Sequence, residues 1–252
     1  MPRANRHILP GYVYHLTHRC HDRKFLLGFQ RDRNAYRDWL REGSGRYGLS
    51  VLGYCITSNH VHLVVVAPGV EAVSRTMQLA AGCSAGQYNA RKGRKGAFWE
   101  DRYAATLVES GEHLLNCLAY VDLNMVRAGV VEHPSGWEWC GWREVTGLRT
   151  RYRVLDLDGL AESLRRRSRR ELAEAYERVI EQKLAAERVE REARWTESLA
   201  VGSEQYVREV AGKIGRRRRI DIFKCPEMEG GTWRARESAP SYMRFSPPKK
   251  RR

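Results

Sequence analysis

Apolar residues recur at every second position in four short segments of the first half of the chain, and at every third or fourth position between them. The two-residue period predicts β-strands over residues 12–18, 49–56, 60–66 and 103–108. The longer period predicts helices over residues 32–47, 70–91 and 113–127. The order strand, helix, strand, strand, helix, strand, helix is typical of an α+β fold, a ferredoxin-like antiparallel sheet with helices on one face.

The predicted helix over residues 113–127 has two different faces. One face is apolar and spaced for burial, and comprises Leu114, Leu118, Val121 and Met125. The other face carries hydrogen-bonding and ionisable groups, and comprises His113, Asn116, Tyr120, Asn124 and Arg127. An ordinary solvated face would usually be rich in Lys and Glu. A tyrosine one turn away from an amide oxygen instead suits a nucleolytic centre next to a histidine pair.

Two histidines interrupt the apolar strand over residues 60–66. Because side chains alternate along a strand, His60 and His62 project from the same face. Two imidazoles on a rigid strand make half of a metal site. A His-x-His pair also arises by chance, so the spacing alone leaves surface or hydrogen-bonded histidines as an alternative. His15, in the first strand, is expected to be a sheet histidine with a structural partner.

The chain of 252 residues has a formal net charge of +15 and a pI of about 9.9, so its surface suits a polyanion. No apolar run approaches the ~20 residues of a membrane span, and the N-terminus lacks a signal-peptide core. The six cysteines are scattered without a Cys-x-x-Cys pair, which fits a reducing compartment. We therefore expect an intracellular protein that binds nucleic acid and no membrane.

Basic residues gather in loops and at predicted helix ends. Residues 91–96 form a cationic loop before two aromatics, which suits either a nucleic-acid strand or a solvated loop anchored by its aromatics. The candidate DNA-binding residues are Arg19, Arg23, Lys24, Arg91, Lys92, Arg94, Lys95, Arg102, Arg127, Arg216, Arg217, Arg218 and Arg219. Arg102 and Arg127 are equally suited to structural ion pairs.

The character of the chain changes after residue 150. We interpret residues 1–150 as the main domain, residues 151–224 as a helical basic extension and residues 225–252 as a disordered basic tail. Within the extension, residues 168–199 predict a charged helix with a thin apolar stripe. A short helix starting at Ser203 ends in a run of arginines, and is either a helix-turn-helix reader of DNA or a basic docking helix.

Three segments resemble the REP-associated tyrosine transposases, which are single-tyrosine members of the HUH endonuclease superfamily. The segments are YCITSNHVHLVVV, FWEDRY and YVDLNMVRAG, and their order and spacing match over residues 12–142. The chain departs from the family pattern at Met125, because a proline usually follows the asparagine there. A proline would bend or end the helix, so Met125 is expected to let the helix continue and to shift Asn124 and Arg127.

The resemblance implies a metal-dependent nuclease and transposase that acts on single-stranded hairpin DNA. Tyr120 would be the nucleophile, and His60, His62 and Asn124 would hold one divalent cation, Mg²⁺ or Mn²⁺. The tyrosine hydroxyl needs activation, since its unperturbed pKa is ~10. Its attack would leave a 5′-phosphotyrosine and a free 3′-hydroxyl, and another 3′-hydroxyl would rejoin the DNA.

Two other classes of function stay open. One is a domesticated protein that binds hairpin DNA or RNA without cleaving it, and the other is a metal-dependent hydrolase whose nucleophile is water. The four site residues argue against the first class, since binding alone needs none of them, and a covalent adduct would exclude the second. We expect a monomer, because the C-terminal extension is placed to cover a dimer surface, and a cytoplasmic bacterial protein associated with the nucleoid.

Overall fold

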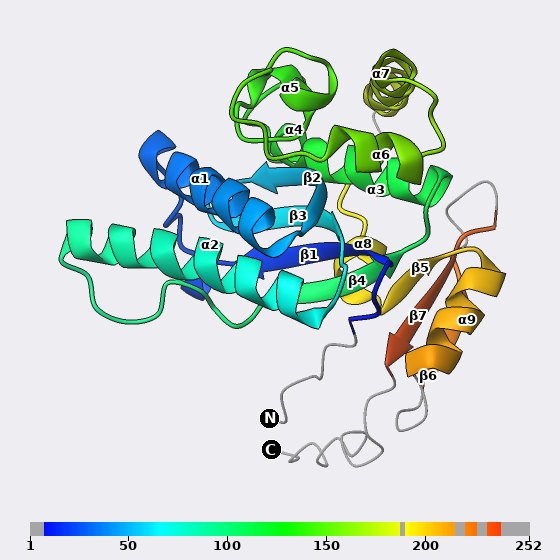
Figure 1. Ribbon diagram of the computed structural model, residues 1–252, viewed down its shortest axis with the longest axis horizontal. Helices are drawn as coiled ribbons and strands as arrows, with labels where there is room; N and C mark the ends of the chain where they lie inside the picture. Colours follow the sequence, from blue (N-terminus) through cyan, green and yellow to red (C-terminus); the bar gives the residue numbers. More distant parts are fainter. Residues whose placement is uncertain (1–7, 187–189, 215–219, 226–230, 238–252) are drawn as a thin grey trace, which may run out of the picture.

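The computed structural model describes residues 8–186, 190–214, 220–225 and 231–237. Within these residues, seven strands form one sheet in the order β2-β3-β1-β4-β5-β7-β6 (Figure 1). The strands are β1 Val13–Arg19, β2 Ser50–Ile56, β3 His60–Val66, β4 Ala104–Val108, β5 Ala200–Gly202, β6 Ile220–Lys224 and β7 Trp233–Glu237.

The first four strands confirm the ferredoxin-like topology. Along the chain they alternate with α1 (Gln30–Tyr47) and α2 (Val70–Lys92) in the order β1-α1-β2-β3-α2-β4. In space β1 pairs antiparallel with β3 and with β4, and β3 pairs antiparallel with β2. The two helices pack on each other along one face of the sheet (Figure 1). Gly48 ends α1 at a φ of 67°, in the left-handed region that favours glycine.

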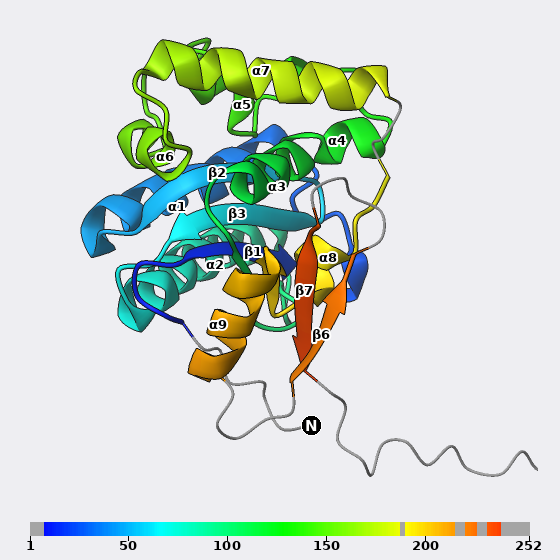
Figure 2. The same ribbon diagram turned by 90° about the vertical axis from the view of Figure 1, so that its right-hand side faces the viewer.

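The opposite face of the sheet is covered by α3 (Glu112–Asp122) and α8 (Arg194–Glu197), whereas α9 (Glu204–Ile214) packs on the C-terminal strands β5, β6 and β7 (Figure 2). The predicted apolar face of α3 is buried in the core, as expected from its spacing. Gly53 on β2 lets α3 approach closely, because a Cβ at this position would overlap the Cδ2 atom of Leu118. The helix carrying Tyr120 therefore lies directly on the strands that carry the histidines.

The outer edge of β2 is covered by a loop rather than by another strand. Ile56 N donates to Trp139 O at 2.8 Å, and Gly141 N donates to Tyr54 O at 2.9 Å. The loop joins α4 (Asn124–Arg127) to the later helices, and Trp137, Trp139 and Trp142 are buried in it. These tryptophans pack the end of the domain, as expected. Further short or peripheral helices are η1 His21–Arg23, η2 Pro134–Gly136, α5 Trp142–Val145, α6 Leu157–Ser163 and α7 Arg169–Ala185.

The C-terminal extension was expected to be helical, and this prediction was wrong in part. Strand β5 pairs parallel with β4, where Leu107 lies opposite Ala200, and a β6–β7 hairpin continues the sheet. Three-residue β5 is too short to show a period, so only its long-range pairing defines it. The helix expected over residues 168–199 is α7 alone, which ends at Ala185, followed by the single turn of α8.

The disordered tail expected over residues 225–252 also needs correction. Its residues 231–237 are ordered, and β7 places Ala235 in the core, fully buried. The alternation of buried and exposed side chains in β7 is short, since Ala235 alone in this strand is fully buried. Such a short pattern is hard to recognise among the Pro, Gly and charged residues of this region. The remaining residues, 226–230 and 238–252, lie outside the described part of the chain.

Two simple expectations concern cysteines and membranes. Five of the six cysteines are buried, as expected for core packing. None of the helices in the described ranges combines the length and the hydropathy that crossing a membrane requires.

Candidate metal centre and nucleophile

Strand β3 places the His60 and His62 rings side by side, with centroids 4.8 Å apart. The preceding turn orients His60: its backbone N–H donates to Thr57 Oγ1 at 3.1 Å, and Thr57 Oγ1 donates to its carbonyl at 2.8 Å. His60 Nδ1 lies 2.7 Å from Asn59 Oδ1, which can only accept. Nδ1 therefore carries the proton, and Nε2 of a neutral His60 keeps a lone pair for a metal.

The tautomer of His62 is set by a chain of three groups. His15 Nδ1 lies 2.7 Å from the carbonyl oxygen of Trp195, which can only accept a proton, so His15 Nδ1 is the donor. His15 Nε2 is then the acceptor in its 2.8 Å hydrogen bond with His62 Nδ1. His62 Nδ1 carries the proton, and His62 Nε2 keeps its lone pair. Both histidines of the pair thus present an unprotonated Nε2.

The environment keeps these imidazoles neutral. Burial, with a smaller effect of Arg19, lowers the pKa of His60 to about 4. Burial also lowers the pKa of His62 well below its usual value, and lowers the pKa of His15 to about 4. Neutral imidazole is the form that binds metal, because a protonated ring nitrogen has no lone pair to donate.

Tyr120 lies on α3 directly above the histidines. Its ring centroid is 6.0 Å from that of His62 and 6.1 Å from that of His15, in edge-on arrangements. Burial raises the pKa of Tyr120, and the guanidinium of Arg127, 4.1 Å from the ring centroid, opposes that rise. Arg127 also donates to the Tyr120 carbonyl at 2.8 Å. A positive charge is therefore held over a tyrosine that faces the buried histidines.

Asn124 reaches the same centre through a break in its helix. The helix expected over residues 113–127 is interrupted at Leu123, where φ is −74° and ψ is 4°, and a separate turn begins at Asn124. The expectation that Met125 lets the helix continue was therefore wrong, since a break occurs without proline. The Asn124 side chain is 9% exposed and lies near enough to the His60 imidazole to oppose the fall of its pKa.

The donor set can be tested against a divalent cation. Among the described residues, no cluster of three or more His, Cys, Asp or Glu side chains is placed to hold a metal. The candidate set instead combines two imidazoles with the carboxamide of Asn124, an oxygen donor outside those residue types. Two unprotonated Nε2 atoms and an amide beside them fit a divalent cation that accepts mixed nitrogen and oxygen ligands.

Comparisons with known proteins address the family. Residues 9–124 match the family model described as "Transposase IS200 like". Residues 9–124 are an IS200-like transposase domain. The match contains the two histidines and the tyrosine and ends at Asn124, so the segment that supplies Trp195 lies beyond it.

Individual relatives are more distant. A REP-associated tyrosine transposase of Haemophilus influenzae is 24% identical over 151 residues, which cover 55% of this chain and 84% of the relative. The solved structure of a REP-associated tyrosine transposase bound to a REP hairpin is 16% identical, with a TM-score of 0.47, covering 60% of this chain and 89% of that one. A transposase structure from Deinococcus radiodurans is 19% identical, with a TM-score of 0.33, covering 44% and 88%.

Three of the candidate DNA-binding arginines lie close to the candidate metal centre formed by His60, His62 and Asn124. Arg19 is opposite His60 in the β1–β3 register, and Arg127 stacks on Tyr120. Arg19 and Arg102 line a cavity of about 220 Å³ that also touches Thr17. These positions stay candidates for phosphate contacts, with Arg127 buried and already bonded to Tyr120.

Several other candidates have intramolecular partners. Arg91 pairs with the buried Asp32, Lys24 pairs with Asp22 at 3.0 Å, and Arg94 donates to Ala97 O at 2.7 Å. The Lys92 ammonium lies 5.3 Å from the Phe29 ring centroid, and Lys95 and Arg23 are exposed. Arg91 and Arg94 thus shape the cationic loop of the transposase domain. Four candidates lie outside the described residues, namely Arg216, Arg217, Arg218 and Arg219.

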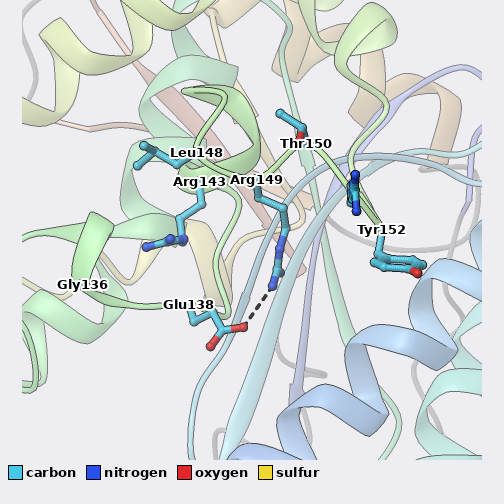
Figure 3. A pocket seen from close by; sticks show the side chains of 8 residues that line it. Gly136, Glu138, Arg143, Leu148, Arg149, Thr150 and Tyr152 are labelled. Carbon is cyan, nitrogen blue, oxygen red and sulfur yellow. Dashed lines mark hydrogen bonds and ion pairs between the residues drawn. The ribbon is translucent and has the colours of Figure 1, made fainter.

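A basic cavity of about 550 Å³ lies away from the candidate centre and is lined by residues 136–152, in the segment that covers β2 (Figure 3). Two of its three arginines are bound within the protein: Arg149 pairs with Glu138 at 3.0 Å, and Arg143 donates to the Ser135 carbonyl at 3.0 Å. Arg37 of α1 lies 3.5 Å from the same Glu138 carboxylate. These contacts fasten the loop to α1, so we assign the cavity a structural role.

Sequence reasoning missed the role of His15 and of Trp195. His15 has structural partners, as expected, but one of them is His62 itself. One signal was available, because the alternation of β1 puts His15, Thr17 and Arg19 on one face of the strand. The carbonyl of Trp195 left no sequence signal, because any residue has one.

Proposed function

We propose that this protein cleaves and rejoins single-stranded DNA through a covalent 5′-phosphotyrosine on Tyr120, with a divalent cation, Mg²⁺ or Mn²⁺, held by His60, His62 and Asn124. One observation carries the proposal. Three separate elements, β3, α3 and α4, bring two unprotonated imidazole nitrogens, a carboxamide and a tyrosine to one buried centre. An IS200-like transposase domain is the setting in which such a centre would act.

The chemistry of the chain's own residues follows from their positions. The Tyr120 oxygen attacks the scissile phosphorus, the bond from phosphorus to the 3′ oxygen breaks, and that oxygen leaves as a 3′-hydroxyl after taking up a proton. The Tyr120 proton passes to solvent or to a neighbouring base, and Arg127 stabilises the phenolate that forms. A bound cation would polarise the phosphate oxygens and stabilise the charge of the transition state.

The reverse step rejoins the strand. A 3′-hydroxyl attacks the phosphotyrosine, the bond between phosphorus and Tyr120 breaks, and a phosphodiester forms again. One phosphodiester is exchanged for another through a tyrosine ester, so the cycle needs no nucleotide cofactor. This exchange is the difference between a strand transferase and a hydrolase that uses water.

Hairpin DNA is the substrate we propose. A relative and a solved structure named as REP-associated tyrosine transposases motivate this choice, and the latter is named as bound to a REP hairpin. The positive charge of the chain and the Arg19–Arg102 cavity beside the centre are consistent with a polyanionic strand.

We also propose that the protein acts as a monomer. Strands β5, β7 and β6 occupy the β4 side of the sheet, where a second copy of the domain would otherwise be able to add its own strand. The molar mass in solution should therefore stay that of one chain over a wide range of protein concentration. A mass that doubles as the concentration rises would refute the monomer.

The test of function uses labelled single-stranded hairpin oligonucleotides taken from around the protein's own gene, with Mn²⁺, Mg²⁺ or chelator. Tyr120→Phe is compared with Tyr152→Phe, which changes an exposed tyrosine far from the centre. We expect a metal-dependent adduct that survives denaturation in the parent and in Tyr152→Phe, and none in Tyr120→Phe. Tight binding without any adduct would favour the non-cleaving binder. Cleavage that persists in Tyr120→Phe would favour the water-dependent hydrolase.

A further inference from the structure

A second cavity, of about 460 Å³, lies on the opposite face of the sheet from the histidine pair, between α2 and the segment that leads into β4. His18 lines it, and His18 alternates along β1 with Thr17 and Arg19, which face the catalytic side. The cavity and the catalytic centre are therefore separated by one strand.

The floor of this cavity is aromatic and apolar. The Trp99 ring stacks on His18 with centroids 4.0 Å apart, and Met77 and Tyr103 complete the lining. Trp99 Nε1 donates to the Ala81 carbonyl on α2 at 3.0 Å, and Phe98 packs against its ring at 4.9 Å. The indole is thus fixed in place before any ligand binds, which lowers the entropic cost of stacking on it.

The rim of the cavity is polar. Ser74 and Gln78 on α2 are exposed at its mouth, and the Asp101 and Arg102 residues close the other side. A hydroxyl, a carboxamide and a carboxylate offer both donors and acceptors above an aromatic floor. Flat heteroaromatic groups with exocyclic amines and carbonyls, the nucleobases, match this combination.

Gly82 keeps the wall of the cavity open. It lies inside α2, where glycine costs roughly 1 kcal/mol relative to alanine, and nothing lies within 4 Å of an added Cβ. A larger side chain there would have room to extend beside the other residues that line the cavity. Gly86, one turn later on α2, has equally open surroundings and does not line the cavity.

The two faces of the sheet are connected at Arg102. Asp101 and Arg102 line this cavity and also the smaller cavity of about 220 Å³ that contains Thr17 and Arg19. In the β1–β3 register, Thr17 lies opposite His62 and Arg19 lies opposite His60. A single strand of DNA that runs from the histidine pair past Arg19 would therefore reach Arg102 and the rim of the aromatic cavity.

We propose that the cavity floored by Trp99 binds one unpaired base of the single-stranded DNA, while Arg19 and Arg102 contact the backbone between this base and the scissile phosphate. The proposal rests on the proposed function, because it takes the strand at the catalytic centre as its starting point. Stacking on Trp99 supplies affinity, and the rim of Ser74, Gln78 and Asp101 discriminates between bases. The cavity would thus fix which nucleotide lies at a set distance from the cut.

The test measures binding and leaves cleavage out. In a Tyr120→Phe background without metal, single abasic sites are walked along a fluorescent oligonucleotide, and affinity is read by anisotropy. An abasic site keeps its phosphate, so it removes stacking alone. We expect one position at which the affinity falls about tenfold, since one base stacked on an aromatic residue contributes roughly that much or more. A uniform response at all positions would overturn the proposal.

Gly82→Leu and Gly86→Leu are the matched variants. Gly82→Leu should bind the intact oligonucleotide about tenfold more weakly than the parent does. An abasic site at the sensitive position should then cause no further loss of affinity in this variant. Gly86→Leu should behave as the parent. Equal affinity of both variants for the intact oligonucleotide would refute the base pocket. Circular dichroism of both variants confirms that α2 stays folded.

A measurement on the unchanged chain makes the result independent of folding. An oligonucleotide with 5-iododeoxyuridine at the sensitive position should cross-link on irradiation to Trp99 or Tyr103, as identified by mass spectrometry. A cross-link confined to residues outside this cavity would refute the proposal. If no phosphotyrosine forms in the cleavage assay while the abasic effect persists, the proposed function fails and the base pocket stands.

Discussion

His15 Nε2 accepts a hydrogen bond of 2.8 Å from His62 Nδ1, and His15 in turn donates to the carbonyl of Trp195 at 2.7 Å. This chain of bonds fixes both rings in one tautomer and leaves His62 Nε2 free for a cation. An outer hydrogen-bond partner of this kind commonly changes metal affinity by 10–100-fold. His15 is therefore a positioning residue of the proposed centre, although it is not one of the proposed ligands.

Replacing His15 should weaken metal binding although the proposed ligand residues His60, His62 and Asn124 are all kept. We expect His15→Phe to weaken Mn²⁺ binding about tenfold or more, measured from the EPR signal of free Mn²⁺. In the metal-free parent, long-range ¹H–¹⁵N spectra should show His62 protonated at Nδ1, and in His15→Phe a mixture of tautomers. His21→Ala, a half-exposed histidine outside this chain of bonds, serves as the control. A pure Nε2-protonated His62 in the parent would contradict the assignment.

Removing the charge of Arg127 should slow the tyrosine. Burial raises the pKa of Tyr120, and Arg127 and then Arg191 lower it, so Arg127→Gln removes the larger opposing charge and raises that pKa further. Adduct formation at neutral pH should then fall about tenfold for each unit of the rise, and the pH–rate profile should move to higher pH. Arg127→Lys keeps the charge and should lose less. Identical profiles for the Gln and Lys variants would show that the charge of Arg127 plays no part.

Asp122 should make the protein less stable as pH rises. Burial, against hydrogen bonds from Tyr176 and Gly141, raises the pKa of Asp122 from 3.8 to about 7. Between these values the folded protein binds a proton that the unfolded chain has lost, so the free energy of unfolding falls as pH rises from about 4 to about 7. The stability that the proton provides is fully present at a pH below the pKa of Asp122 in the unfolded chain. It is lost at a pH above the pKa of Asp122 in the folded protein.

The corresponding variant is Asp122→Asn, whose carboxamide replaces the protonated carboxyl between Tyr176 and Gly141. We expect its urea midpoint to vary less with pH over the same window and to exceed that of the parent above pH ~7. Asp158→Asn, at an exposed ion pair with Arg169, should leave the slope unchanged. The explanation fails if the parent and Asp122→Asn show the same dependence on pH.

A methyl group on β2 should push α3 away from the sheet. The Cβ of Gly53→Ala would overlap Leu118 Cδ2, so we expect a loss of about 1–3 kcal/mol in the free energy of unfolding. Gly45→Ala in α1 meets no atom within 4 Å and should stabilise the protein by about 0.4–1 kcal/mol. In Gly53→Ala, the further change Leu118→Val should recover part of the loss. Simple addition of the two single effects would count against a steric cause.

The part of this molecule that could be predicted from the sequence is the part that local patterns determine. Alternation along β3 was enough to put His60 and His62 on one face, and helical spacing separated the buried Leu118 from Tyr120. The order of four strands and two helices was then enough for the ferredoxin-like topology, because few arrangements satisfy it.

The rest depends on contacts between distant segments. Ala200 joins β4 opposite Leu107 through backbone groups that every residue carries, so no side-chain pattern indicates the pairing. The break at Leu123 has no proline or glycine to signal it, yet it decides where Asn124 lies. The proton on His62 depends on a carbonyl 180 residues away from His15. Single-sequence periods contain none of this information.

The distance between His15 and Trp195 along the chain also sets an order in time. During synthesis the strands that carry His15 and His62 leave the ribosome well before α8. This helix contains Trp195, which is 180 positions after His15. A nascent chain can therefore form its four-stranded sheet while His15 still lacks the carbonyl that orients it. The ligand pair acquires its defined tautomers only after this late segment docks, so translation itself delays the assembly of a centre proposed to cut DNA.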